Sequence, residues 1–477
     1  MINSRIDSLI SGWIESNKAS VLEKWINLAK IPSITSEPAE NAPFGVNCAK
    51  ALEYASEIFS EEGFECELDR EGGYALARYG KGAKKIGLYS HSDVVPVGED
   101  WIYTKPFEPV IVDGALIGRG VEDNKSGIIH AYCLYKFLKD NDIELKNRLE
   151  TFIGSDEECG MKDMDAYLEK HIVPDVSIVP DADFPCSIGE KGIYHFWAEC
   201  RNTFEDVIDF CGGEAFNIVL DKATVAIKYS EALEKEISDR ISGKDCFILD
   251  KEDDKLKLTA RGIAKHASIP EGSVNATYLL SSVLTGCESL CENDRKIMGS
   301  VTSVLSSCYG HSLDIAHEDK NFGKLTSVNG MVKTENGKIA VSFDVRYGST
   351  LSPEELVEKS TARLDSEGFD VVGGNNSPGF AIEEGSPYPA VFEDIYGEII
   401  GEKIPSIRMS GGTYARRIKN AFSIGTYAYK KDRATPVLKM PDGHGGAHQC
   451  DEMIDIEGFF TAFRILIYYI LACDELV

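Results

Sequence analysis

The sequence predicts an α/β fold that is interrupted by an α+β insertion. Three observations support this prediction. The first third of the chain alternates helical and extended patterns. Near Gly189 the sequence pattern changes to longer polar loops and alternating strands. After Gly385 the pattern returns to helix–turn–strand units. We therefore expect a main domain built from residues 1–187 and 386–477, with residues 188–385 inserted as a second domain.

The elements of the first third follow from their hydrophobic periodicity. Apolar residues at helical spacing predict helices, and short apolar runs that end in turn residues predict strands. The helices are expected within residues 48–64 and 126–141, and the strands within residues 84–95, 147–160 and 176–185. Because strands separated by helices usually pair in parallel, we expect a mixed, mostly parallel sheet with helices on both faces. Ligands of such sheets bind beyond the carboxyl ends of the strands.

The insertion and the C-terminal segment have different patterns. Alternating strands are expected within residues 194–200, 255–265 and 338–348, with helices between them. The most apolar stretch of the chain, residues 458–472, is interrupted by Arg464 and is shorter than a bilayer requires. It therefore predicts a core helix and not a membrane span.

Composition narrows the class of protein. The 477 residues carry a formal net charge of −28 and no block of basic residues, so neither nucleic acid nor an anionic membrane is an expected partner. The first 33 residues mix charged and apolar residues and lack the apolar core of a secretory signal. Thirteen cysteines without a Cys-x-x-Cys pair indicate reduced thiols in the cytoplasm.

Residues that commonly bind metals occur in five short segments, four of which follow a predicted strand. The segments carry His91 and Asp93, Asp123, Glu157 and Glu158, Asp181, and His448. Taken singly, each carboxylate could be a helix cap or a turn residue. Their joint placement predicts a site for two cations about 3.5–4 Å apart that share one carboxylate. Nitrogen and oxygen ligands without thiolate suit zinc, cobalt or manganese.

The adjacent pair Glu157–Glu158 is the sharpest local feature. Two crowded carboxylates repel each other unless a cation or a shared proton compensates their charge. If Glu158 binds metal, Glu157 can act as a general base toward an activated water. The alternative interpretation is an exposed acidic turn in an acidic protein.

The five segments, in this order, resemble the motifs of the dinuclear zinc peptidase family, which includes aminoacylases, glutamate-releasing carboxypeptidases and bacterial dipeptidases. The matching motifs are "SHSD", "GRGVEDNK", "DEECG", "VPDAD" and "AHQCDE". The resemblance implies that His91, Asp123 and Asp181 bind one zinc, and that Asp123, Glu158 and His448 bind the other. It also implies that Glu157 is the general base and that Asp93 orients the His91 imidazole.

The resemblance extends to the insertion, which is similar to the family's lid domain. It implies that His266 in "KHASIPEGSVNA" reaches the scissile carbonyl. It also implies that the carboxylate end of the substrate is held by a group of further residues, namely Asn217, Arg346, Gly411, Gly412 and Thr413. The alternatives are that Arg346 pairs with a surface acid and that the Gly–Gly pair only marks a turn.

One ligand position has two candidate histidines, and another position departs from the family pattern. His444 competes with His448 for the ligand role, and we prefer His448 because the spacing from it to Glu452 matches the family. The family often has Asp-Asp-Lys where this chain has Asp123-Asn124-Lys125, so a second carboxylate is missing there. The peptide after the shared aspartate is commonly cis in the family, and we predict a cis Asp123–Asn124 bond.

The resemblance implies a zinc-dependent dipeptidase that hydrolyses short peptides with a terminal carboxylate. The insertion is about twice the length of one small lid unit, which resembles the bacterial dipeptidase V branch with a doubled, ferredoxin-like lid. His266 would then act within its own chain, and we expect a monomer. An N-acyl amino acid deacylase and a catalytically silent peptide-binding relative are the alternatives. The latter would be expected to lack Glu157 or a ligand, and both are present.

Overall fold

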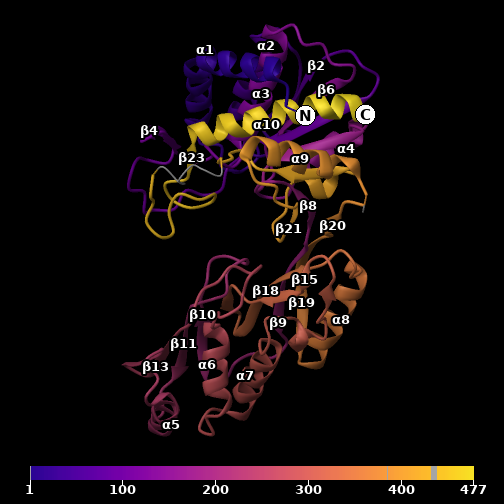
Figure 1. Ribbon diagram of the computed structural model, residues 1–477. Helices are drawn as coiled ribbons and strands as arrows, with labels where there is room; N and C mark the ends of the chain where they lie inside the picture. Colours follow the sequence, from indigo (N-terminus) through magenta and orange to yellow (C-terminus); the bar gives the residue numbers. More distant parts are fainter. Residues whose placement is uncertain (1, 384, 431–437) are drawn as a thin grey trace. The chain divides into compact units, whose positions relative to one another are not determined.

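The computed structural model describes residues 2–383, 385–430 and 438–477, which fall into two compact units (Figure 1). Unit 1 consists of Met1–Gly189, Ile382–Ile407 and Thr413–Val477, and unit 2 of Glu190–Ala381 and Arg408–Gly412. The sequence placed the boundaries of the insertion at residues 188 and 385. The second excursion of the chain into unit 2, at Arg408–Gly412, was not anticipated.

Unit 1 is built on a mixed sheet in the strand order β1-β2-β6-β3-β7-β22-β8. The strands are β1 (Glu65–Asp69), β2 (Tyr74–Tyr79), β3 (Lys85–His91), β6 (Arg148–Gly154), β7 (Val176–Pro180), β8 (Ser187–Glu190) and β22 (Ala421–Ile424). The four central strands β6, β3, β7 and β22 are parallel, whereas β1, β2 and β8 are antiparallel to their neighbours. The mixed sheet is confirmed, and its parallel pairing is confined to the centre.

Helices cover both faces of this sheet. They are α1 (Ser4–Ala29), α2 (Val46–Ser60), α3 (Lys125–Asp140), α4 (Lys162–Lys170), α9 (Pro387–Ile400) and α10 (Ile456–Leu476). Consecutive strand residues point to opposite faces. Leu88 thus joins the large core that includes α2, α3 and α10, while Tyr89 packs against Tyr167 of α4. This two-sided cover explains why the central strands are continuously buried.

The C-terminal helix α10 is held in this core as the sequence predicted. It begins after Asp455, whose side chain accepts a hydrogen bond from the Gly458 amide. The helix is long and apolar enough to cross a membrane by length and composition, but most of it is buried inside unit 1. Phe459 packs against Trp25 of α1 and Phe463 packs against Trp13, which is the packing of a core helix.

A small sheet connects two segments of unit 1 that are far apart in the sequence. Its strand order is β23-β5-β4, with β4 at Val110–Val112, β5 at Ala115–Ile117 and β23 at Met453–Asp455. The pairing of β5 with β23 continues beyond the strands, where the Gly118 amide donates to the Glu452 carbonyl at 2.9 Å. The residues before α3 are thereby held against the residues that follow His448.

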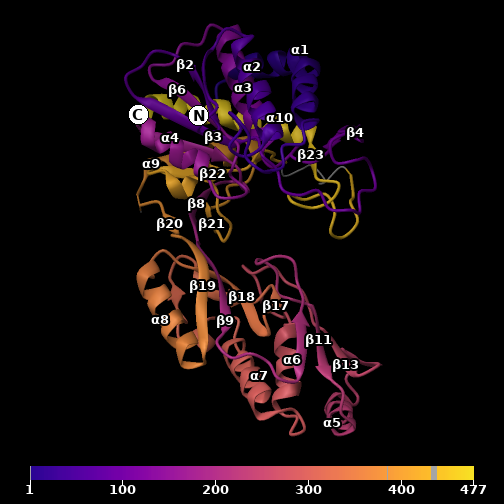
Figure 2. The same ribbon diagram turned by 180° about the vertical axis from the view of Figure 1, so that it is seen from behind.

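Unit 2 contains two large antiparallel sheets (Figure 2) and a small one formed by β14 (Glu318–Asp319) and β15 (Gly323–Lys324). The first has the order β10-β11-β13-β12 and the second the order β16-β18-β9-β19, with β17 beside β18. The strands are β9 (Gly192–Cys200), β10 (Val207–Cys211), β11 (Lys222–Lys228), β12 (Phe247–Glu252), β13 (Lys255–Arg261), β16 (Thr326–Val328), β17 (Val332–Glu335), β18 (Lys338–Tyr347) and β19 (Phe369–Ser377). The helices are α5 (Glu231–Ile241), α6 (Ala276–Thr285), α7 (Glu292–Val304) and α8 (Pro353–Ser366). Both sheets contribute to one hydrophobic core, so the insertion is an α+β domain as predicted.

Candidate metal centre

The parallel strands of unit 1 bring three of the predicted segments to one edge of the sheet. β3 ends at His91, which pairs in register with Gly154 at the end of β6. β7 ends at Pro180, one residue before Asp181. Because parallel strands end on the same side of a sheet, His91, the turn Glu157–Glu158 and Asp181 converge there.

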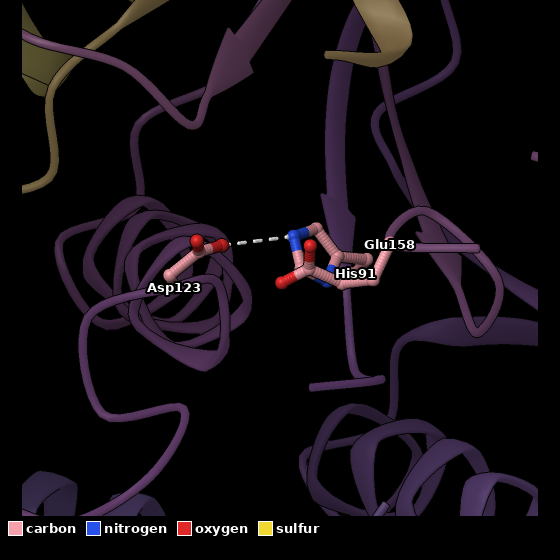
Figure 3. A group of neighbouring side chains, drawn as sticks. All are labelled: His91, Asp123 and Glu158. Carbon is pink, nitrogen blue, oxygen red and sulfur yellow. Dashed lines mark hydrogen bonds and ion pairs between the residues drawn. The ribbon is translucent and has the colours of Figure 1, made fainter. Parts of the chain in front are cut away.

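Asp123 lies between the two predicted histidine ligands. Its Oδ1 atom is 3.1 Å from Nε2 of His91, and its Oδ2 atom is 3.0 Å from Nε2 of His448. Figure 3 shows the His91 imidazole directed at the carboxylate of Asp123, which precedes α3. One carboxylate thus presents a different oxygen to each imidazole, an arrangement that lets it bridge two cations.

The other two predicted ligands complete the cluster. Oδ2 of Asp181 is 3.7 Å from Nε2 of His91, and Oε1 of Glu158 is 3.2 Å from Nε2 of His448. Potential ligand atoms of two groups lie within 4.8 Å of one another. The groups are His91 with Asp123 and Glu158, and His91 with Glu157 and Asp181. The structure therefore gathers all five predicted ligands together with Glu157, while their division between two cations stays a prediction.

Asp93 holds the acidic turn as well as the imidazole. The closest partner of His91 Nδ1 is the main-chain oxygen of Asp93 at 3.0 Å, and the Asp93 carboxylate is 3.4 Å away. With Nδ1 directed at Asp93, Nε2 lies on the side of Asp123, where it can bind a cation once its own proton has left. The Asp93 carboxylate also accepts the backbone amides of Glu157 and Glu158 at 3.2 and 3.1 Å. The family resemblance implied only that the Asp93 carboxylate orients the imidazole, and in the structure the main-chain oxygen of Asp93 is the closer partner.

Asn124 contacts the ligand Asp181 directly. The peptide between Asp123 and Asn124 is cis, as predicted. Nδ2 of Asn124 donates to Oδ1 of Asp181 at 2.8 Å and to the carbonyl of Pro180 at 2.5 Å. The amide therefore leaves Oδ2 of Asp181 directed at His91, and it stabilises a carboxylate that a second carboxylate would repel.

The two competing histidines have different surroundings. Nδ1 of His444 pairs with Oδ2 of the buried Asp451 at 2.7 Å. The same aspartate accepts the amides of Ile102 and Tyr103, so this pair anchors a loop. His448 has a backbone φ of 65° and directs its imidazole at Asp123 instead. The geometry therefore agrees with the choice of His448 over His444.

Burial and crowded charge set the pKa values of the cluster. Burial raises the pKa of Glu157 well above its usual range, and the nearby carboxylates of Asp181 and Glu158 raise it further. Burial and the charge of Asp123 raise the pKa of Glu158 to about 7. Hydrogen bonds to Asp123 and Glu158 raise the pKa of His448 to about 11. These directions indicate a strongly negative site in which protons compensate the charge that a cation could compensate instead.

The donor set fits divalent cations. It consists of imidazole nitrogens and carboxylate oxygens, the ligands of zinc, cobalt and manganese. Oε1 of Glu157 is buried without a hydrogen-bond partner among the described residues, although buried polar atoms are normally paired. Ligand atoms 3.0–3.2 Å apart also approach the separation of about 3.3 Å expected around tetrahedral zinc with bonds of about 2.0–2.1 Å.

Two of the predicted lid residues are neighbours within unit 2. The Ala267 amide donates to the Asn217 carbonyl at 2.8 Å, and Ile218 forms a bridge with His266. Nδ1 of His266 accepts the backbone amide of Ser268 at 3.2 Å and lies 2.6 Å from the hydroxyl of that serine. In the neutral imidazole this places the proton on Nε2.

Arg346 forms an ion pair with the buried Asp344. Pairing with an acid was the alternative role for Arg346, although a surface acid was expected. Its Nε and Nη2 atoms donate to both oxygens of Asp344 at 2.6 and 2.8 Å, and its Nη1 donates to the carbonyl of Ser410 at 2.9 Å. Asp344 also lies 2.9 Å from Nε2 of His195. The alternation of side chains along β18 was the available signal for Asp344, since residues two apart share a face. Among the residues that the structure describes, three of the five N–H groups of the guanidinium have acceptors, which leaves two for another acceptor.

The glycine-rich segment is divided between the units. Gly411 and Gly412 belong to unit 2, whereas Thr413 belongs to unit 1. The Thr413 hydroxyl lies 2.9 Å from Ser423 Oγ and accepts the Ala415 amide at 3.1 Å. Its side chain therefore shapes its own turn, and a role in substrate binding would fall to the main chain.

Known proteins with similar sequences are peptidases, in agreement with the geometry of the site. A family model described as peptidase family M20/M25/M40 matches residues 87–472. A protein of Staphylococcus aureus strain MRSA252, named as a candidate dipeptidase, is 28% identical over 461 residues, which cover 92% of this chain and 94% of the relative.

Solved structures also resemble this chain. Human carnosine dipeptidase 1 is similar with a TM-score of 0.60 and 14% identity, over 98% of this chain and 99% of that one. A dinuclear metal-binding peptidase of Bacillus subtilis is similar with a TM-score of 0.52 and 10% identity, over 97% of this chain and 100% of that one. At these identities the likeness shows the fold alone.

Proposed function

The chain belongs to peptidase family M20/M25/M40 and is a peptide-bond hydrolase, and from this premise we propose that it is a dinuclear metallo-dipeptidase. The proposed substrates are short peptides with a terminal carboxylate, and the proposed cofactors are two Zn²⁺ ions, with Co²⁺ or Mn²⁺ as substitutes. The proposed ligands are His91, Asp123, Glu158, Asp181 and His448.

One observation carries the proposal. Asp123 presents Oδ1 to His91 at 3.1 Å and Oδ2 to His448 at 3.0 Å, so a single carboxylate can serve two cations. A lone structural ion pair would need only one of these contacts. The buried Oε1 of Glu157, which has no hydrogen-bond partner among the described residues, lies within the same cluster, so this carboxylate is close enough to act on a water beside the cations.

Glu157 would move the protons of the reaction. Two divalent cations, when bound, would polarise the scissile carbonyl and lower the pKa of the attacking water. The carboxylate of Glu157 would take a proton from this water and pass it to the leaving amine. Asp93 would keep Glu157 in place through the backbone amide at 3.2 Å.

Residues of the lid would bind and orient the substrate. The Nε2–H group of His266 would donate to the developing oxyanion. Asn217, whose main chain pairs with that of the residue after His266, would bind the substrate. Arg346, fixed by Asp344, would bind the terminal carboxylate of the substrate with its remaining N–H groups, assisted by the main chain of Gly411, Gly412 and Thr413. With the terminal carboxylate fixed, the length of the substrate determines where the scissile bond lies.

We further propose that His266 acts within its own chain and that the enzyme is a monomer. We also propose that it is located in the cytoplasm, a reducing compartment in which its thirteen free thiols would persist.

A substrate panel tests this proposal. The metal-loaded protein would be incubated with free dipeptides and N-acyl amino acids, and the products measured by mass spectrometry. We expect cleavage of free dipeptides. Glu157→Gln should lower turnover by about 10²–10⁴-fold while the protein keeps two cations per chain. Cleavage of N-acyl amino acids alone would contradict the substrate assignment, and an active Glu157→Gln variant would contradict the role of Glu157.

A further inference from the structure

A buried ion pair connects the segments that carry the candidate ligands. Nη1 of Arg119 donates to Oε2 of Glu452 at 2.8 Å, and both side chains are 1% exposed. Arg119 lies four residues before Asp123, and Glu452 lies four residues after His448. Burying two charges costs free energy that their attraction often only offsets, so this pair is not explained by stability alone.

The Glu452 carboxylate holds the backbone that leads to Asp123. Its Oε2 atom accepts the Gly120 amide at 3.0 Å, and its Oε1 atom accepts the amides of Glu122 and Asp123 at 2.9 and 3.1 Å. With Arg119, four donors therefore occupy this carboxylate, which has about four acceptor positions. Glu452 is saturated by these contacts and cannot bind a cation itself.

Arg119 holds the two other segments. Its Nη2 atom donates to the carbonyls of Pro96 and Val97 at 3.2 and 3.4 Å, and to the carbonyl of His448 at 3.4 Å. Pro96 and Val97 follow the segment of His91 and Asp93. The guanidinium also lies over the ring of Trp101 with its carbon 5.6 Å from the centroid. One guanidinium thus contacts the main chain of the segment that follows Asp93 and the main chain of the ligand His448.

We propose that Glu452 and Arg119 are positioning residues of the metal centre, which fix Asp123 relative to His448. This inference rests on the proposed dinuclear function. Because Asp123 faces His448 at 3.0 Å, a shift in either backbone segment changes the geometry of a shared ligand. The pair acts through these ligands and contacts neither substrate nor cation.

Metal affinity separates positioning from ordinary structural support. In Glu452→Gln the amide nitrogen would face backbone N–H donors, so at least one of the four hydrogen bonds is lost. We expect the affinity for Co²⁺, measured by competition with a chelator and by visible absorption, to fall by about 10–100-fold. At saturating metal, kcat should fall with little change in KM.

Glu150→Gln is the matched control. Glu150 of β6 is also a buried carboxylate of unit 1, with its side chain 2% exposed, and it pairs with Arg78 of β2 at 3.0 Å. The Glu150→Gln variant should unfold at a lower urea concentration than the parent chain while keeping the parental affinity for Co²⁺. Arg119→Lys, which keeps the charge but cannot make the same set of contacts, should weaken Co²⁺ binding as Glu452→Gln does, and it replaces that variant if Glu452→Gln does not fold.

Parental Co²⁺ affinity in the tested variant, with or without loss of stability, would overturn the inference. Failure of the parent chain to bind two Co²⁺ ions would instead overturn the proposed function. The two failures are therefore distinguishable.

Discussion

Replacing Asn124 by aspartate would test how the chain manages charge beside Asp181. Asn124 is 1% exposed, and its Nδ2 atom donates to Oδ1 of Asp181 at 2.8 Å. Asn124→Asp places a second carboxyl group at that contact. At an effective dielectric constant of about 20, two charges about 3–4 Å apart repel each other by about 4–6 kcal/mol. The new carboxyl group would therefore take up a proton in the metal-free protein.

The sign of the pH dependence follows from this proton. The folded-state pKa of the new carboxyl group would lie above its unfolded value of about 3.9, so the folded chain binds more protons than the unfolded chain, and stability falls as pH rises. The loss is about 1.4 kcal/mol for each pH unit between the unfolded and folded pKa values. It reaches about 1.5 kcal/mol at pH 5 and about 4 kcal/mol at pH 7 if the folded pKa is 7 or higher.

Urea unfolding of metal-free parent and variant at pH 5 and pH 7 measures this difference. Asn124→Ser is the control, because it removes the amide donor without adding a charge and should lose about 1 kcal/mol at both pH values. An Asn124→Asp variant that loses the same free energy of unfolding at pH 5 and pH 7 would refute the reasoning.

Two further predictions concern the substrate grip and the protons of the metal centre. Arg346→Lys cannot form the two-pronged contact with Asp344, so KM for dipeptides should rise by about 10–100-fold with a smaller change in kcat. Initial-rate kinetics measure this, and an unchanged KM would remove Arg346 from the grip. Hydrogen bonds to Asp123 and Glu158 raise the pKa of His448 to about 11, so this imidazole carries a proton at pH 7 that must leave before the nitrogen can bind a cation. Adding Zn²⁺ to the metal-free protein in weak buffer should therefore release at least one proton per chain, and an unchanged pH would contradict this assignment.

The fold class and the gathering of candidate ligands could be predicted because both depend on local patterns. A strand that ends at His91 and another that ends one residue before Asp181 are visible as apolar runs, and parallel pairing brings their ends together. The β1–β2 hairpin was not predicted. β1 is only partly buried, and β2 is buried along its first four residues, so neither strand shows a regular alternation of buried and exposed residues. The crossing at Arg408–Gly412 depends on tertiary contacts that no local pattern indicates.

The contacts that support the candidate ligands could not be predicted from local patterns. Asn124 meets Asp181 at a separation of 57 residues, and Glu452 meets the Asp123 amide at a separation of 329. The dual contact of Asp93 with His91 and the Glu157 amide likewise depends on how two strand ends meet. Such partners are fixed by the three-dimensional arrangement, whereas the motifs indicate only the ligand types.

The number of cations bound when Asp123 is replaced tests the dinuclear centre most directly. Equilibrium dialysis against Co²⁺ with elemental analysis would count the bound ions, and electron paramagnetic resonance would show whether they are coupled. We predict two ions per parent chain, magnetically coupled at a separation of about 3.5–4 Å. In Asp123→Ala both sites lose a ligand, so tight binding of both ions should be lost. Two tightly bound Co²⁺ ions in Asp123→Ala would contradict the shared-ligand centre.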